Sequence, residues 1–399
     1  MKPDQAHQLT DKELEILEKR IAGEFRKAAG ELNDRITAYF EQLKKRDAQQ
    51  LERLQNGEIS AEYYKQWRLA QIGRGKRFEA LRDRMAERYT RANETAAAYI
   101  NDASPGIYSL NRNYAAYTIE RQAGEDVGFD LWDEQTVRRL LVEEPDLMPY
   151  YPPRRAVKRG IDLAWGKRQI TAQVTSGILL GESIPRLADR LQKNIPEMNR
   201  ASAVRAARTA VTGAQNAGRM DSFRAAEEMG ISLEREWMAT LDNRTRHAHR
   251  ILDRQRAKMD EPFRVDGYEI WYPGDSNAPG YLVYNCRCTL VAEVKGTPKA
   301  PNPLRIAEDP ETGKKALISD MSYAQWEAWK SSENRYIWDT YQKMGKNLSA
   351  DGKQHREYRK LLRSEVPETL WGFQTLKYRQ PYRWEKLKAM AREKRIGKD

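Results

Sequence analysis

Two short polar clusters hold the residues best suited to chemistry in this 399-residue chain. The first runs from Asp242 to His249, and the second from Asn285 to Cys288. Together they contain two of the four histidines and both cysteines of the sequence. Because a sheet brings segments that are distant in sequence side by side, we expect the two clusters to meet at one site.

A zinc site is one interpretation of these clusters, because thiolate and imidazole ligands together complete the tetrahedron that zinc prefers. The candidate ligands are His247, His249, Cys286 and Cys288. The two cysteines share one face if they lie on a strand, whereas the two histidines do so only in extended backbone. One intervening residue is also fewer than common structural zinc motifs place between paired ligands.

Two other interpretations stay open. In a catalytic one, Asp242 and His249 act as acid and base. Arg244 or Arg287 would then hold a phosphate group. In a structural one, Asp242 forms an ion pair with Arg246 or with one of those two arginines. His249 then makes a buried hydrogen bond, and the cysteines are small core residues.

The elements around the clusters indicate a small α+β unit. A helix precedes three β-rich segments, at 200–229, 233–240, 263–272 and 288–294 in turn. The middle β segment reads as a hairpin that turns at Asp266 and Gly267. This is the only sheet that the sequence indicates.

Long helices are predicted before this unit. A capping box at Thr10 to Glu13 precedes nine apolar residues between Leu14 and Leu43. Their mean spacing of about 3.6 residues is that of a straight α-helix. A second helical segment covers about 60–102. Ordinary helical packing is the favoured interpretation of these stripes. The alternative is that they form an interface with a partner protein.

Clusters of proline and glycine divide the chain, at 104–106 and 145–153 and again between 296 and 313. The predicted fold is mainly α with a small α+β domain. It has long N-terminal helices, a helix plus a small antiparallel sheet in the middle, and a helical basic tail. The predicted regions are 1–104 (long helices), 105–197 (mixed, mostly helical), 198–295 (α+β domain), 296–320 (Pro-rich linker) and 321–399 (basic aromatic tail).

The composition favours a polyanionic partner. Lys and Arg number 70 against 58 Asp and Glu, a net charge of +12. The sequence has no apolar run of about 18 residues, so a membrane partner is not expected. Two cysteines with one residue between them exclude a disulfide scaffold. The start has no apolar stretch of the kind found in signal peptides, so we expect a reducing cytoplasm as the place of synthesis.

The tail concentrates this charge, with 13 Lys or Arg and six Asp or Glu from His355 to Asp399. Basic residues interleaved with aromatic ones suit non-specific binding of double-stranded DNA. The alternative is a solvated helix whose aromatic residues dock on a protein. The candidate DNA-binding residues are Arg379, Arg383, Lys386, Lys388, Arg392, Lys394 and Arg395.

An ordered set of motifs between residues 198 and 295 resembles the minor head protein family of tailed bacteriophages, through a head-morphogenesis domain similar to the F protein of phage Mu. The motifs are Arg208-Thr209, Trp237, Asp242-Asn243-Arg244-Thr245-Arg246, His249, Pro262-Phe263, Tyr272-Pro273-Gly274-Asp275 and Asn285-Cys286-Arg287-Cys288. The chain departs from the pattern at Arg254, where the family has glycine. The pattern holds His249 but not His247, so a zinc site that uses His247 would be peculiar to this chain.

The resemblance implies a minor capsid protein of the virion that acts in head morphogenesis in the host cytoplasm. Its implied partners are the portal protein, other capsid or scaffold subunits and packaged DNA, whose retention or ejection it assists. No catalytic mechanism comes with the family, and no cofactor is expected, although zinc stays open. One alternative is a metal-dependent DNA-processing phosphodiesterase built on Asp242, Arg244, His249 and Arg287. The other is a non-specific DNA-binding protein outside any capsid.

Overall fold

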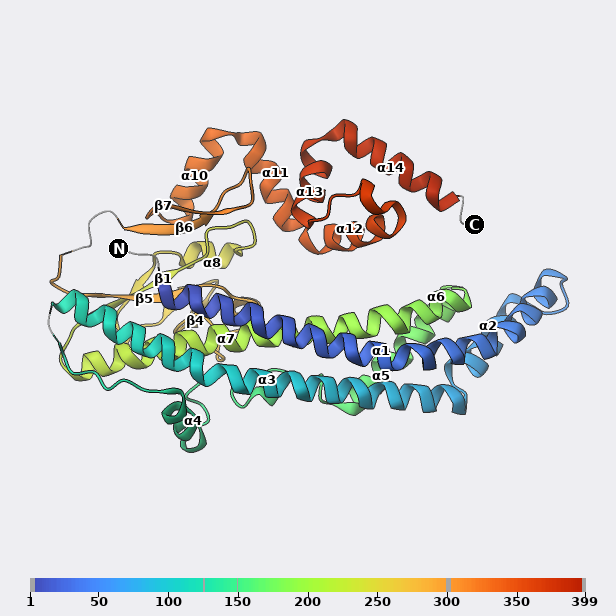
Figure 1. The fold of residues 1–399 in the computed structure, drawn as a ribbon, viewed down its shortest axis with the longest axis horizontal. Helices are drawn as coiled ribbons and strands as arrows, with labels where there is room; N and C mark the ends of the chain where they lie inside the picture. Colours follow the sequence, from blue (N-terminus) through green and yellow to red (C-terminus); the bar gives the residue numbers. More distant parts are fainter. Residues whose placement is uncertain (1–3, 125, 149, 299–302, 397–399) are drawn as a thin grey trace.

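Three long helices lie side by side and form the body of the molecule (Figure 1). They are α1 (Gln5–Gln55), α3 (Lys76–Ala123) and α7 (Ile195–Glu228). The computed structural model describes residues 4–124, 126–148, 150–298 and 303–396, with side chains up to residue 394. Small sheets pack at one end of the long helices, and the C-terminal helices form a separate layer (Figure 1). The fold is mainly α with a small α+β domain, as predicted.

Helix α1 begins upstream of the predicted capping box. The carboxylate of Asp4 accepts a hydrogen bond from the backbone N–H of His7 at 2.9 Å and so caps the helix. Thr10 lies inside the helix, where its hydroxyl donates to a carbonyl one turn earlier. The predicted start at Thr10 is wrong because Asp4, which is paired with the buried Arg219, supplies a cap further upstream.

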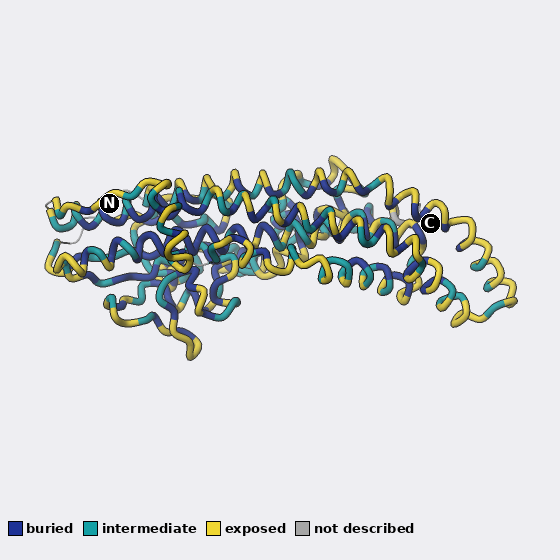
Figure 2. The backbone as a smooth tube through the Cα atoms, turned by 90° about the horizontal axis from the view of Figure 1, so that it is seen from below, coloured by how far each residue is buried: buried dark blue, intermediate teal, exposed yellow. Residues whose placement is uncertain are grey.

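The apolar stripe of α1 is confirmed, and it packs inside the chain. Residues from Leu17 to Leu43 share one core with α3 and α7, and the Tyr39 hydroxyl donates to the carbonyl oxygen of Ile72 at 2.7 Å. Figure 2 shows buried stretches along these helices, whereas the far tip, at the end of α1 and in α2 (Ala61–Arg68), is largely exposed. The favoured interpretation, packing within the chain, is therefore confirmed, and the alternative of a partner interface is wrong because the folded chain covers the stripe.

Helix α3 runs without interruption through the break predicted at 104–106, so the predicted boundary falls within a helix. Pro105 is buried inside it. An internal proline costs about 3 kcal/mol, and the tertiary packing of this helix outweighs that cost. Residues 60–102 are likewise not one helix, since a short π-helical turn and a bend separate α2 from α3. The helices between α3 and α7 are α4 (Glu134–Glu143), α5 (Leu163–Leu179) and α6 (Ile184–Asp189).

The predicted sheet is confirmed and is antiparallel. Its strand order is β2 (Arg256–Ala257), β1 (Leu233–Met238) and β5 (Thr289–Val294), with Trp237 opposite Leu290. The predicted hairpin is also present, as β3 (Phe263–Val265) and β4 (Tyr268–Ile270). It turns at Asp266 and Gly267, both of which have positive φ, as a tight hairpin turn requires.

The segment predicted as a Pro-rich linker contains a second hairpin. Strands β6 (Leu304–Glu308) and β7 (Lys315–Ser319) pair antiparallel, and the backbone N–H of Glu308 donates to the carbonyl of Leu241 at 2.9 Å. The prediction of a plain linker there is wrong because Pro303 and Pro310 flank the strand rather than interrupt it. Residues 299–302 of that segment lie outside the described part of the chain.

The tail is helical, as predicted, and has two small aromatic cores. Its helices are α10 (Tyr323–Glu333), α11 (Arg335–Lys346), α12 (Leu348–Leu362), α13 (Leu370–Arg379) and α14 (Pro381–Ile396). One core joins Trp326, Trp338 and Tyr341 to Leu241 of the α+β domain, and the other lies within α12, α13 and α14. Among the described residues, no helix combines the length and apolar character of a membrane span.

Candidate functional site

The two polar clusters meet, as predicted, between β1, the N-terminal end of β5 and helix α8 (His247–Leu252). Asp242 lies at the centre of one half of the site and is 2% exposed. Both of its carboxylate oxygens accept hydrogen bonds from the guanidinium of Arg287. Arg244 adds its backbone N–H at 2.9 Å and a side-chain ion pair at 3.1 Å. Burial alone would raise the pKa of Asp242, but Arg287 and Arg244 hold it at about 2.

These contacts make Asp242 a structural anchor. The hydroxyl of Thr245 also contacts its carboxylate at 3.2 Å, and the hydroxyl of Tyr323 donates to its backbone carbonyl at 3.0 Å. A carboxylate with a low pKa and its oxygens occupied by arginines is poorly suited to act as a general acid or base. Of the three candidate arginines, Arg246 does not pair with Asp242 but donates to the carbonyls of Tyr281 and Tyr284.

The other half of the site is a buried group of one imidazole and two thiols. The Nδ1 atom of His249 lies 3.3 Å from Cys288 Sγ and 3.7 Å from Cys286 Sγ. Its Nε2 atom lies 2.8 Å from the carbonyl oxygen of Leu282. Because a carbonyl can only accept, Nε2 carries the proton, and the lone pair of Nδ1 faces the two sulfur atoms.

His247 is not part of this group. It is exposed at the start of α8, whereas His249 is buried, because residues two apart on a helix point in different directions. The four-ligand set predicted from the sequence is thus reduced to three. Among the described residues, His249, Cys286 and Cys288 form the one group of three or more potential metal ligands, with ligand atoms within 4.8 Å of one another.

The remaining motif residues hold the site in place. Trp237 is fully buried and packs edge-to-face on His249, with ring centroids 5.9 Å apart. The backbone of Asn285 has a positive φ of 54°. The turn at this residue directs the carbonyl group of Cys286 toward α7. There the hydroxyl of Thr212 donates to the carbonyl of Cys286 at 2.6 Å. The family motif therefore marks the contacts among α7, β1, α8 and β5.

Sequence reasoning missed two other buried polar groups. Arg235 is fully buried in β1 and donates to the carbonyl of Trp271 at 2.8 Å, and burial lowers its pKa to about 10. Asp253 is hydrogen-bonded to the backbone N–H groups of Ala239 and Tyr323, both at 2.7 Å, and to Arg305 of β6. Nothing in the sequence around Arg235 indicates that this arginine is buried. The only sequence feature that pointed to Asp253 is its place before Arg254, where the family has glycine.

The departure at Arg254 has a structural explanation. Its φ is 69°, in the left-handed region that glycine enters without strain. Arg254 lacks that conformational freedom, but its side chain forms ion pairs with Glu236 and Asp320. The expected glycine position is therefore a backbone requirement, which this chain meets with a charged residue.

The tail candidates divide into structural and exposed residues. Arg379 donates to the carbonyls of Pro310 and Glu311 at 2.7 and 2.9 Å, so its role is structural. Most tail aromatics are also structural, since Trp384 stacks on Tyr358 and lies edge-on to Phe373. Lys388 pairs with Glu385. The exposed candidates are Arg383, Lys386, Arg392 and Lys394, and the side chain of Arg395 lies outside the described part.

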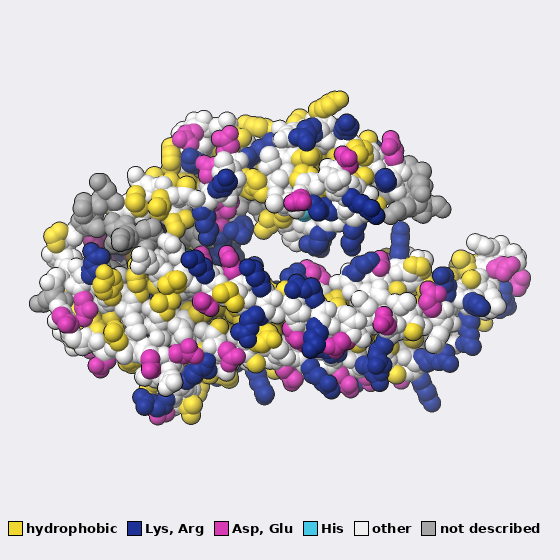
Figure 3. Space-filling view, viewed as in Figure 1, with side chains coloured by type: hydrophobic (Ala, Val, Ile, Leu, Met, Phe, Trp, Pro, Cys, Tyr) yellow, Lys and Arg dark blue, Asp and Glu magenta, His cyan; other side chains and the backbone are white. Residues whose placement is uncertain are grey.

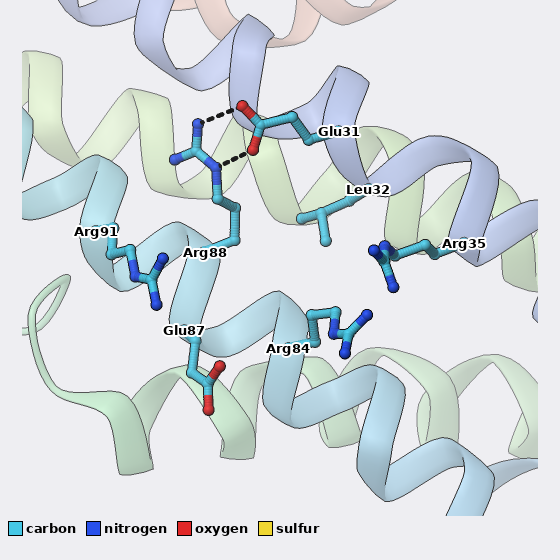
Figure 4. A pocket seen from close by; sticks show the side chains of 7 residues that line it. All are labelled: Glu31, Leu32, Arg35, Arg84, Glu87, Arg88 and Arg91. Atoms are coloured by element: carbon cyan, nitrogen blue, oxygen red, sulfur yellow. Dashed lines mark hydrogen bonds and ion pairs between the residues drawn. The ribbon is translucent and has the colours of Figure 1, made fainter.

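A shallow hollow of about 480 Å³ lies between α1 and α3, away from both clusters. Figure 4 shows four arginines around it, of which Arg88 forms a two-pronged ion pair with Glu31. Arg35, Arg84 and Arg91 have no ion pair with any described residue. The hollow offers charge for binding but neither a nucleophile nor a group of metal ligands.

One family model and two known proteins are similar in sequence to this chain. Residues 168–291 match the family described as Phage Mu protein F like protein. Minor head protein GP7 of Bacillus phage SPP1 is 26% identical over 320 residues, which cover 79% of this chain and 93% of that protein. NAD(+)--arginine ADP-ribosyltransferase EFV of Enterococcus faecalis (strain ATCC 700802 / V583) is 28% identical over 167 residues, which cover 42% of this chain and 32% of that protein. No solved structure matches the chain.

The family match runs from within α5 into β5 and includes Asp242, Arg287 and the group of His249, Cys286 and Cys288. The similarity to GP7 extends well beyond that domain and takes in most of both chains. This chain is therefore similar to a phage minor head protein over most of its length, and its residues 168–291 match the Phage Mu protein F like family.

Proposed function

We propose that this chain is a phage head protein that acts in head morphogenesis at the portal, contacts packaged DNA and assists its retention or ejection, without catalysis. The similarity to a minor head protein over nearly all of that protein's length is the observation that carries the proposal. The site geometry supports a non-enzymatic role, because the carboxylate oxygens of Asp242 already accept hydrogen bonds from Arg287 and Arg244. The described residues also lack the carboxylate cluster that a two-metal phosphodiesterase needs.

We propose that DNA binds in the gap between the C-terminal helices and the long helices. Figure 3 shows an open space between α12 and the long helices, with Lys and Arg side chains on both sides of it. Helix α12 and the turn after it carry four exposed basic residues that pair with no described acidic residue, namely Lys353, Arg356, Lys360 and Arg363. A duplex carries one negative charge per about 1.7 Å of its length. A gap with cations on both sides suits such a backbone without reading its sequence.

We propose that the portal protein binds at the hollow between α1 and α3. Its unpaired Arg35, Arg84 and Arg91 lie beside Glu31 and Glu87. With four arginines against two glutamates, the lining is net positive and fits a predominantly acidic surface on a partner protein. The hollow also lies on the rigid packed part of the long helices rather than at their exposed tip.

A gel-shift experiment with supercoiled plasmid at several salt concentrations tests the DNA contact. Neutralisation of about five phosphates predicts that log affinity falls with log salt at a slope of roughly −4 to −5. Alanine at Lys353, Arg356 and Lys360 should flatten the slope by up to about 3. A matched control removes three exposed charges beside α3, at Arg154, Lys158 and Arg159, and should leave the slope unchanged.

The same gels test the absence of catalysis. Incubation with Mg²⁺ or Mn²⁺ should leave the plasmid supercoiled, as it is in EDTA. Nicking that EDTA abolishes would contradict the proposal and favour the phosphodiesterase alternative. A salt-independent shift, or equal effects of the two triple variants, would contradict the placement of DNA along α12.

A further inference from the structure

We infer that His249, Cys286 and Cys288 bind one zinc ion that fastens helix α8 to the start of β5. This inference rests on their geometry and is independent of the proposed contacts with DNA and the portal. Three potential ligands from two segments 37 residues apart converge in the interior of the protein, with each residue no more than 3% exposed.

The interatomic distances are those of a tetrahedral metal site. Zinc–sulfur bonds of about 2.3 Å and zinc–nitrogen bonds of about 2.0 Å at tetrahedral angles place the sulfur and nitrogen atoms about 3.5 Å apart. In the protein, Nδ1 of His249 lies 3.3 Å from one sulfur and 3.7 Å from the other. Both sulfur–nitrogen distances thus fit two ligands of one ion, and all three ligand atoms lie within 4.8 Å of one another.

The groups around the ligands are those of a metal site as well. Metal-bound histidines characteristically donate their second ring N–H to a carbonyl or carboxylate, which fixes the tautomer. His249 does so, with Nε2 at 2.8 Å from the carbonyl of Leu282, so Nδ1 is left free to coordinate. The indole N–H of Trp237 is buried and lies beside the sulfur atom of Cys288. A metal-bound thiolate at Cys288 would give it an acceptor.

Zinc binding would release the proton of each cysteine thiol and leave histidine neutral. Three protein ligands leave the fourth position of the tetrahedron to a water molecule. His247, exposed on the same short helix, cannot supply it without unwinding α8. The ion would hold together the elements that also meet at Trp237 and Thr212, so its role is structural.

The test measures metal in the full-length chain purified without chelators and without a histidine tag. Elemental analysis by mass spectrometry should find one zinc per chain. After replacement by Co²⁺, absorption should show thiolate-to-cobalt charge transfer and the intense visible bands of tetrahedral cobalt. Neither measurement depends on a variant that folds.

Variants then assign the ligands. His249→Ala and Cys288→Ser should each lose the bound zinc, whereas the matched control His247→Ala should retain one zinc per chain. The inference is overturned if the wild-type chain is free of metal, alkylates at both thiols and keeps its Tm when zinc is added. A disulfide between Cys286 and Cys288 in the chain purified from a reducing cytoplasm would overturn it equally.

Discussion

Replacing Asp242 with alanine should destabilise the α+β domain by about 3 kcal/mol. The shift of its pKa from 3.8 to about 2 corresponds to about 2.5 kcal/mol of net stabilisation of the charged carboxylate, after the opposing effect of burial. Removal of one partner also leaves the other charge uncompensated, and breaking a buried pair typically costs about 3 to 5 kcal/mol. We expect the lower end, because the side chain of Arg287 is 28% exposed and can be rehydrated.

The assay is native-state hydrogen exchange of peptides that cover β1 and β5. The chain has several separate cores, so a global melting curve would not report on one two-state transition. Asp189→Ala is the control, since its ion pair with Lys193 is half exposed and such pairs contribute less than about 1 kcal/mol. Equal, small effects of both substitutions on β1 and β5 would refute the anchoring role of Asp242.

Three further predictions concern the same architecture. Because Asp242 has a lowered pKa, its stabilisation should be complete above about pH 4 and should be lost as the pH falls toward 2; an equally steep acid transition in Asp242→Ala, followed by circular dichroism, would argue against it. At the positive φ of Arg254, Arg254→Gly should be more stable than Arg254→Ala by about 1 kcal/mol in urea denaturation, since only alanine keeps the strain; equal stability would contradict a backbone requirement. Gly218→Ala should destabilise the long helices by about 1 to 3 kcal/mol, because its Cβ would overlap the carbonyl of Tyr108 on α3. Gly30→Ala meets no atom within 4 Å and should be neutral or stabilising; equal losses of hydrogen-exchange protection in α3 and α7 for the two variants would refute the close packing of α3 on α7.

Periodic segments were the most predictable parts of this chain. The stripe from Leu17 to Leu43 and the β segments at 233–238 and 289–294 follow from side-chain spacing alone. The hairpin at Asp266 and Gly267 follows from its turn residues. Local signals failed where tertiary packing decided the outcome. Pro105 reads as a break, yet the buried surface of α3 holds it in a helix.

The site was predictable in its members but not in its geometry. Residue types and order placed Asp242 with Arg287, and His249 with the cysteines. The sequence could not exclude His247 as a ligand, because that depended on whether residues 247–249 are helical or extended. The tail aromatics were ambiguous for a similar reason. Stacking on DNA and packing in a small core use the same side chains, and only the fold shows Phe373 fully buried.

We propose that this chain is a head component recruited through the portal. The most direct measurement is its copy number in procapsids assembled with and without portal protein, determined by quantitative mass spectrometry of purified particles. We predict that the chain enters particles that contain portal, and that its content falls when portal is omitted or when Arg35, Arg84 and Arg91 are changed to glutamate. Absence of the chain from portal-containing procapsids, or equal amounts of it in particles without portal, would contradict recruitment through the portal.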